Sequence, residues 1–198
     1  MAIHKLRHFI GEIAALVDAD TAEPELLERG GHALRALIQA DDWLPDAFAQ
    51  PSTERYQQYL LYADVQQRFS VVSFVWGPGQ QTPIHDHTVW GLIGVLRGAE
   101  LAAPFTRDSD GTLRQAGDEI RLEKGAVEAV SPRIGDIHRV RNAYDDRVSV
   151  SIHVYGANIG AVLRSTYAPE GLAKPFISGY SNETIPNLWD LSKERRQS

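Results

Sequence analysis

The chain has 198 residues, 43% of them hydrophobic and 23% charged, which is the composition of a globular protein and excludes a disordered or fibrous chain. This length is about one and a third times a typical domain, so it predicts one domain with an additional segment. The 20 Lys and Arg residues against 26 Asp and Glu residues give a net charge of −6 without a basic block or a membrane-spanning apolar run, so nucleic acid and membranes are not expected partners and a soluble, cytoplasmic protein is predicted.

Two apolar stripes near the N-terminus predict amphipathic helices. The first has apolar residues at spacings of three and four, namely Ile3, Leu6, Ile10, Ile13 and Val17. The second runs through residues 26–38 and begins after Thr21 and Pro24, a cap and first-turn pair. A third, short helix is predicted between Ser52 and Tyr62.

From Phe69 onward, β-branched and aromatic runs are separated by Gly, Pro and Asp-Gly turn signals. Several short strands with turns between them predict a sandwich or a barrel. Prolines and glycines then crowd the last thirty residues, which indicates an irregular strap. We therefore expect a single structural domain, with packed helices in residues 1–66, a barrel in 67–168 and a strap in 169–198.

Histidines in the predicted strands suggest a metal site. Because the chain has no cysteine, a metal has only His, Asp, Glu or backbone oxygen ligands available. His85 and His87 are two residues apart, so on a strand their imidazoles share one face. His138 follows a Gly-Asp turn about fifty residues later and is a candidate third ligand. The alternative is that these are ordinary core or surface histidines.

The segment from Ser151 to Tyr155 alternates polar and apolar residues with a period of two. On an ordinary strand the polar face meets solvent, whereas in a barrel it can face the interior. If it faces inward, Ser151 can orient His153 and His153 can hydrogen-bond Tyr155, which sets a phenol beside the candidate metal site.

The positions of glycine, histidine and asparagine resemble the two cupin motifs. The matching residues are Gly79, His85, His87 and Gly98 in the first motif and Gly135, His138 and Asn142 in the second. Cupins commonly carry a glutamate ligand shortly after the histidine pair, and Gly91 stands at that place here. The resemblance therefore implies a centre of three neutral imidazoles that leaves the metal charge for exogenous anions to neutralise.

A three-histidine cupin with a Ser-His-Tyr strand resembles the thiol dioxygenases, the group that contains cysteine dioxygenase and 3-mercaptopropionate dioxygenase. The resemblance implies a mainly β fold, a cupin (double-stranded β-helix, jelly-roll) barrel with an N-terminal helical segment. It also implies one Fe(II) per chain on the three histidines, with Tyr155, His153 and Ser151 as a catalytic relay. The implied reaction adds both atoms of O2 to a small thiol carboxylate and yields a sulfinic acid.

The sequence departs from the mammalian-type enzymes of that group beside the histidine pair and at the substrate-binding arginine. Their cross-linking cysteine is absent from Val89-Trp90-Gly91, so no thioether forms, and Trp90 is expected to wall the site instead. Their substrate-binding arginine is replaced in Tyr56-Gln57-Gln58, where Gln58 is the candidate substrate residue and Gln66 or Gln67 are alternatives.

Arg164 matches the carboxylate-binding arginine of mercaptopropionate-type enzymes, although a surface or ion-pair arginine is the alternative. This match implies 3-mercaptopropionate as the preferred substrate and L-cysteine as a possible slower one. Three other functions stay open at this point: an L-cysteine dioxygenase proper, a non-oxidative metal-dependent isomerase or lyase, and a ligand-binding cupin without turnover. The sequence carries no pattern that sets an oligomeric state.

Overall fold

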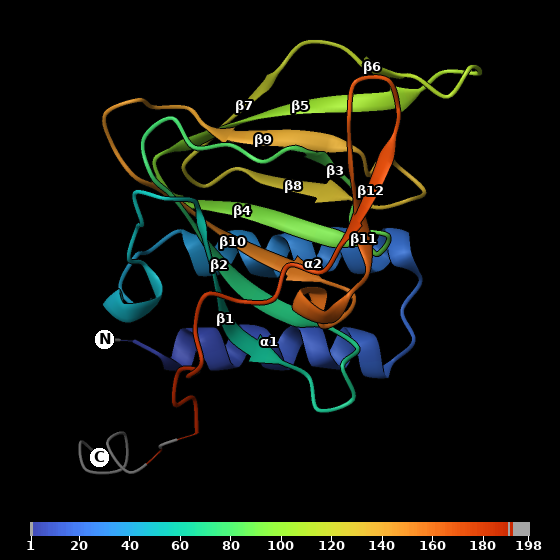
Figure 1. Cartoon of the computed structure of the whole chain (residues 1–198). Coiled ribbons are helices and arrows are strands. Elements are labelled where there is room, and N and C mark those ends of the chain that lie inside the picture. Colours follow the sequence, from blue (N-terminus) through green and yellow to red (C-terminus); the bar gives the residue numbers. More distant parts are fainter. Residues whose placement is uncertain (1, 190, 192–198) are drawn as a thin grey trace.

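Two antiparallel β-sheets lie face to face, and two helices cover the outer face of one of them (Figure 1). The computed structural model describes residues 2–189 and 191. The helices are α1 (His4–Asp18) and α2 (Glu23–Ile38), with short 3-10 turns at Asp46–Phe48 and Ile159–Ala161. The strands are β1 (Gln57–Ala63), β2 (Ser70–Trp76), β3 (Ile84–His85), β4 (Gly91–Arg97), β5 (Ala99–Arg107), β6 (Leu113–Gln115), β7 (Ile120–Glu123), β8 (Val127–Val130), β9 (His138–Asn142), β10 (Ser149–Tyr155), β11 (Arg164–Tyr167) and β12 (Ala173–Phe176).

The strand order shows a jelly roll rather than a meander. One sheet has the order β1-β2-β10-β4-β8, and the other has the order β12-β11-β3-β9-β5-β6, with β7 also pairing with β5. Strands that are distant in sequence are therefore neighbours in space, as in a double-stranded β-helix. The predicted fold class, a mainly β cupin barrel with N-terminal helices, is confirmed.

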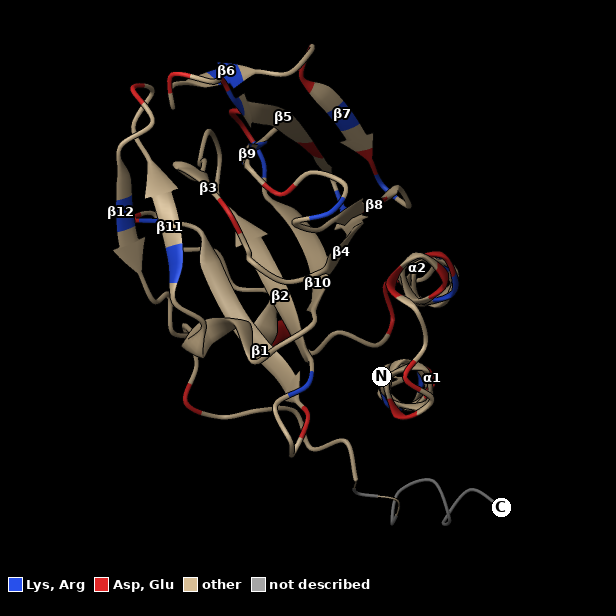
Figure 2. Ribbon diagram, turned by 90° about the vertical axis from the view of Figure 1, so that its right-hand side faces the viewer, with Lys and Arg blue, Asp and Glu red and all other residues tan. Residues whose placement is uncertain are grey.

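The helices pack side by side on the five-stranded sheet (Figure 2). The buried stripe of α1 consists of Leu6, Phe9, Ile10, Ile13 and Leu16. α2 begins at Glu23 with Pro24 in its first turn, but Ala22 rather than Thr21 holds the N-cap position and no side chain caps it. Between residues 2 and 189 and at residue 191, no helix has the length and apolar character needed to cross a bilayer.

One sequence-based prediction of local structure was wrong. The segment predicted as a helix between Ser52 and Tyr62 instead contains strand β1, which pairs with β2. Its alternate residues pack into different cores, Tyr59 and Leu61 toward the helices and Leu60 toward the barrel interior, which is strand periodicity. The predicted irregular strap contains strand β12, paired with β11, and its residues 190 and 192–198 lie outside the described residues.

Gly98 explains how the chain passes from one sheet to the other. It lies alone between β4 and β5, with a backbone φ of +71°, a left-handed conformation that favours glycine. A Cβ atom at this position would also overlap the side chain of Ser149. The motif glycine therefore allows the tight corner that brings the second sheet over the first.

Candidate metal centre and substrate cavity

Three histidines meet inside the barrel. His85 lies on β3 directly opposite His138, the first residue of β9, and His87 follows two residues after His85. One ring nitrogen from each histidine can be chosen so that all three lie within 4.8 Å of one another. All three side chains are buried. The topology thus brings together the two predicted halves of the metal site.

Hydrogen bonds fix the orientation of two of these rings. The Nδ1 atom of His87 lies 2.9 Å from Oδ1 of Asp136, and Nδ1 of His85 lies 3.1 Å from the carbonyl oxygen of Pro83. When Nδ1 carries the proton and donates it, Nε2 keeps a lone pair for a metal. Asp136 also accepts hydrogen bonds from the backbone amides of His87 and Thr88, which hold its carboxylate in place.

Burial keeps the three imidazoles neutral. It lowers the pKa of His85 to about 4, and it lowers the pKa of His87 and of His138 well below the ordinary histidine value. The contact between His87 and Asp136 is therefore a hydrogen bond between a neutral ring and a carboxylate rather than an ion pair. A neutral imidazole is the form that binds a metal ion, so the donor set fits a divalent transition metal.

Gly91 shows why no carboxylate completes this centre. It faces Tyr155 across the β4–β10 pair, and a Cβ atom at Gly91 would lie 3.0 Å from the Tyr155 ring and from Val130. A glutamate therefore does not fit where other cupins place one, because the tyrosine ring occupies that space.

Strand β10 places the polar face of its alternating segment inside the barrel. Val150, Ile152 and Val154 pack toward the helices, while Tyr155 belongs to the core between the sheets. Ser151 Oγ lies 2.8 Å from Nε2 of His153, and Nδ1 of His153 lies 2.7 Å from the Tyr155 hydroxyl.

Aromatic contacts connect this relay to the metal centre. The Tyr155 ring stacks on His87 with centroids 5.1 Å apart, and Phe74 stacks on His153 at 4.0 Å. Burial raises the pKa of Tyr155 well above the ordinary tyrosine value, so its hydroxyl keeps its proton and can donate it in a hydrogen bond.

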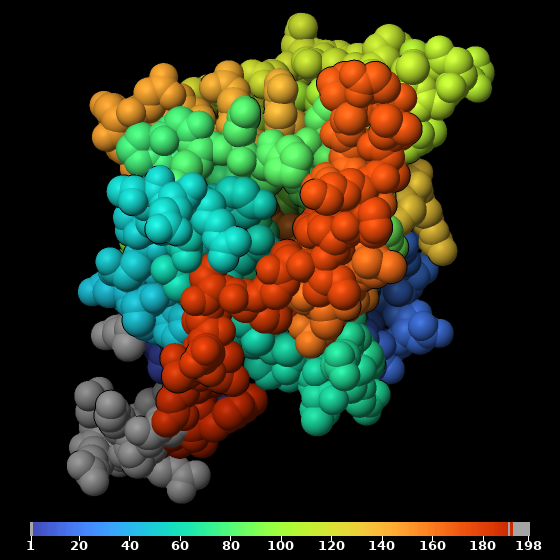
Figure 3. All heavy atoms as spheres, viewed as in Figure 1, coloured from blue at the N-terminus to red at the C-terminus, as the bar shows by residue number. Residues whose placement is uncertain are grey.

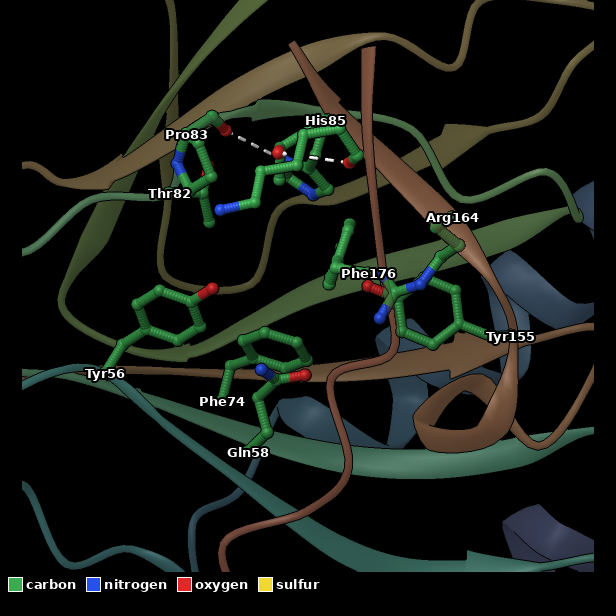
Figure 4. Close-up of a pocket in the computed structure, with 11 residues that line it drawn as sticks. Tyr56, Gln58, Phe74, Thr82, Pro83, His85, Tyr155, Arg164 and Phe176 are labelled. Atoms are coloured by element: carbon green, nitrogen blue, oxygen red, sulfur yellow. Dashed lines mark hydrogen bonds between the residues drawn. The ribbon is translucent and has the colours of Figure 1, made fainter.

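A cavity of about 260 Å³ opens beside the histidines. The lining residues are Tyr56, Gln58, Phe74, Thr82, Pro83, His85, Tyr155, Arg164, Thr166, Lys174 and Phe176. Figure 3 shows the hollow on the surface, bordered by the orange strap, the cyan segment before β1 and the green loop before β3. Inside it, Arg164 lies beside Tyr155, and His85 lies across the space from Phe74 (Figure 4).

Arg164 is a buried cation that contacts the neutral side chains of Ser178 and Phe176. It is 5% exposed, and one terminal nitrogen donates a hydrogen bond to Ser178 Oγ at 2.8 Å. Its guanidinium carbon lies 4.7 Å from the ring centre of Phe176, while its Nε atom has no hydrogen-bond partner among the described residues. Burial lowers the pKa of Arg164, but a guanidinium stays charged in proteins. The structure thus rules out the surface-arginine alternative.

The other predicted substrate residues have different outcomes. Gln58 lines the cavity, whereas Gln66 and Gln67 lie in the exposed turn between β1 and β2 and do not. Trp90 does not line the cavity either, and the expectation that it walls the site was wrong. Because Gly91 faces inward and successive strand residues face opposite sides, Trp90 points to the helix-side core.

Several residues of the site were missed by the sequence reasoning. Tyr56 lines the cavity and is stacked on Phe74, with ring centroids 6.1 Å apart. Phe176 and Ser178, which hold Arg164, come from the strap. Of these residues, only Asp136 could have been found from the sequence, because it lies two residues before His138 in the Gly-Asp turn.

A buried three-histidine centre in a double-stranded β-helix defines a metal-binding cupin. The fold is similar to a protein with a double-stranded β-helix domain from Klebsiella pneumoniae, with a TM-score of 0.47 and 18% identity over 62% of this chain and 95% of that chain. It is also similar to an RmlC-like cupin protein from Desulfovibrio desulfuricans, with a TM-score of 0.41 and 24% identity over 55% of this chain and 88% of that chain.

The family model described as cysteine dioxygenase type I matches residues 10–164, so the chain belongs to that family. It is a thiol dioxygenase with a buried three-histidine metal site. Because the chain belongs to the cysteine dioxygenase type I family, it is neither a non-oxidative isomerase or lyase nor a ligand-binding cupin without turnover.

Proposed function

We propose that the protein binds one Fe(II) per chain at His85, His87 and His138 and oxidises 3-mercaptopropionate to its sulfinic acid, with L-cysteine as a slower substrate. The reaction is RSH + O2 → RSO2H: both oxygen atoms bond to sulfur, and the thiol supplies all the electrons that reduce dioxygen. When bound, Fe(II) supplies positions where a thiolate and O2 can meet and favours the thiolate over the thiol.

The position of Arg164 carries the proposal. It is a buried cation that makes no ion pair with a described carboxylate, and it lines the same cavity as His85. A buried charge is costly unless a partner neutralises it, and a carboxylate matches the guanidinium with two parallel hydrogen bonds. A short substrate with a carboxylate at one end and a thiol at the other can reach both the guanidinium and the histidines.

The charge of the cavity favours a thiol carboxylate without an ammonium group. Its lining contains two basic side chains, Arg164 and Lys174, and no described acidic side chain. Asp86 is close in sequence, but its carboxylate accepts hydrogen bonds from the Ser165 amide and the Tyr167 hydroxyl and does not line the cavity. An α-ammonium group, as in L-cysteine, would therefore meet like charge without a compensating anion.

The relay on β10 is assigned to catalysis. Tyr155 lines the cavity and its ring stacks on the His87 ring, so we assign its hydroxyl the role of donating a hydrogen bond to the reacting groups. One hydrogen bond joins Ser151 to His153 and another joins His153 to the Tyr155 hydroxyl, and together they hold that hydroxyl in place. Gln58, opposite in the cavity, offers a neutral amide to the substrate.

The test compares three thiols side by side with the iron-loaded protein. Oxygen consumption is measured with 3-mercaptopropionate, L-cysteine and cysteamine, and each product is identified by mass. We expect the highest kcat/KM with 3-mercaptopropionate and the lowest with cysteamine, which lacks the carboxylate. A higher kcat/KM with L-cysteine would overturn the substrate assignment, and equal turnover by zinc-loaded protein would overturn the assignment of iron.

A further inference from the structure

Glu100 is a buried acid whose role the proposed reaction leaves unexplained. It lies on β5 and is 0% exposed. Neither of its carboxyl oxygens makes a hydrogen bond to any described residue. Burying a carboxyl group without hydrogen bonds is costly for the neutral acid and still more costly for the ion. A side chain kept at such a cost requires an explanation.

The surroundings of Glu100 connect it to the inner end of the relay. Its carboxyl group lies close enough to the Ser151 hydroxyl and the Trp76 indole N–H for both to lower its pKa, although neither reaches hydrogen-bond geometry. Trp76 Nε1 in turn donates a hydrogen bond to Ser151 Oγ at 3.2 Å. The order along the barrel interior is thus Glu100, Ser151, His153 and Tyr155.

The relay has two possible proton arrangements. Burial lowers the pKa of His153 well below the ordinary value, so the ring is neutral and carries one N–H. In the first arrangement Ser151 donates to Nε2 of His153, Nδ1–H donates to the Tyr155 oxygen, and the Tyr155 O–H is free to donate into the cavity. In the second, Tyr155 donates to Nδ1 and Nε2–H donates to Ser151, so Tyr155 offers the cavity only lone pairs.

The two arrangements differ in the group that accepts the hydrogen bond from the Ser151 hydroxyl. Trp76 is a donor only, so it always occupies one lone pair of Ser151. In the first arrangement the other lone pair can accept the O–H of a protonated Glu100. In the second, the Ser151 O–H is released from His153 and requires an acceptor, which an ionised Glu100 provides. Once a small movement brings Glu100 into hydrogen-bond geometry with Ser151, each arrangement pairs all polar atoms of Ser151 and His153, but with a different protonation state of Glu100.

We propose that Glu100 is a positioning residue of the relay: its neutral form turns the Tyr155 proton toward the substrate, and its ionised form turns that proton toward His153. This inference rests on the proposed function only in that Tyr155 faces the substrate. Glu100 acts through Ser151 and His153 and touches no reacting atom.

The groups around Glu100 set its pKa and therefore the pH at which the relay changes from the first proton arrangement to the second. Burial raises the pKa of Glu100 to about 7, Ser151 and Trp76 oppose this, and the carboxyl group of Glu128 on β8 adds to it. Tyr155 is the other titratable group coupled to Glu100. The residues paired with Glu100 on β7 and β9 are Leu122 and Asn142, which do not titrate. Above about pH 7 the acid ionises, so the donating form of Tyr155 is lost as pH rises.

The tautomer of His153 tests the proposal directly, without metal or substrate. Ring ¹⁵N chemical shifts distinguish Nδ1–H from Nε2–H, and the His153 signals are assigned by their absence in His153→Gln. In metal-free wild-type protein we expect Nδ1–H at pH 5.5 to give way to Nε2–H by pH 8.5. The isosteric Glu100→Gln variant should keep Nδ1–H throughout. A tautomer that does not change in wild-type protein, or that still changes in Glu100→Gln, would overturn the proposal.

Glu128→Gln is the matched control. It removes the neighbouring carboxyl group but leaves Glu100, so the tautomer change should persist with its midpoint at lower pH. In the iron-loaded protein, kcat should fall toward tenfold per pH unit above the midpoint, and Glu100→Gln should remove that fall. If no thiol is oxidised, the proposed function fails while the His153 spectra still decide the role of Glu100.

Discussion

Replacing Arg164 by methionine tests the substrate assignment most directly. Methionine keeps much of the side-chain length and can still pack on the Phe176 ring, but it removes the charge and the hydrogen bond to Ser178. Because the arginine is buried without a described carboxylate partner, removing its charge also removes a desolvation penalty. The variant should therefore melt no lower than the wild-type protein while losing activity.

The size of the loss follows from the buried position of the guanidinium. Truncating one partner of a buried, hydrogen-bonded charge pair costs about 2–5 kcal/mol. At about 1.4 kcal/mol per tenfold change, kcat/KM for 3-mercaptopropionate should fall roughly 30-fold to several thousand-fold. Cysteamine has no carboxylate to lose contact with, and its ammonium group would no longer meet the charge of Arg164, so its kcat/KM should not fall.

The assay is oxygen consumption over a range of thiol concentrations, with sulfinate measured by mass spectrometry. Arg114→Met is the matched control, because Arg114 is an exposed arginine on β6 that does not line the cavity. It should leave kcat/KM unchanged for every thiol. If Arg164→Met kept the wild-type kcat/KM for 3-mercaptopropionate, or lowered that for cysteamine equally, Arg164 would not bind the carboxylate.

Three further predictions concern the relay, the metal centre and the stability of the barrel. Tyr155→Phe removes the hydroxyl that lines the cavity and should lower kcat by about 10²–10⁴-fold while leaving bound iron unchanged; wild-type turnover and coupling of O2 to sulfinate would contradict the relay. Asp136→Asn weakens the hydrogen bond that orients His87 and should reduce metal affinity roughly 10- to 100-fold, measured by competition with a chelator. An unchanged affinity would show that Asp136 does not orient His87 for metal binding. The hydrogen bond from Arg68 lowers the pKa of Asp64 to about 2, so this carboxylate stabilises the fold above the unfolded-state pKa. Asp64→Asn should therefore lower the free energy of unfolding by about 2 kcal/mol at pH 7, and denaturant titrations should show the difference shrinking as pH falls from about 4 to about 2.

Local pattern was sufficient to predict much of the fold. The spacing of Leu6, Ile10 and Ile13 predicted α1, because a single apolar stripe at helical spacing has one stable way to be buried. The cupin barrel was predicted from the resemblance of the glycine and histidine positions to the cupin motifs, and the structure gives the physical reason for one of them, because the corner at Gly98 needs a residue without a side chain. Local pattern failed at residues 57–63, where an edge strand is stabilised by pairing with β2 rather than by its own propensity.

The sequence by itself determined the chemistry that is available: imidazole ligands without thiolates, a Ser-His-Tyr strand, and an arginine at position 164. It did not determine which face of β10 is inside, because a period of two is the same for a solvent face and for a barrel interior. That choice depends on the helices, which bury the apolar face of β10 and leave its polar face to the interior.

Only the tertiary structure decided which distant residues serve one site. Asp136 orients His87 across forty-nine positions of the chain, and Ser178 holds Arg164 from the strap. Glu100 stands just after the Gly98 corner in the sequence, and only the folded barrel shows that it is buried at the end of the relay. Burial and long-range contact set the charge, the pKa and the partners of these groups, and neither is encoded in local spacing.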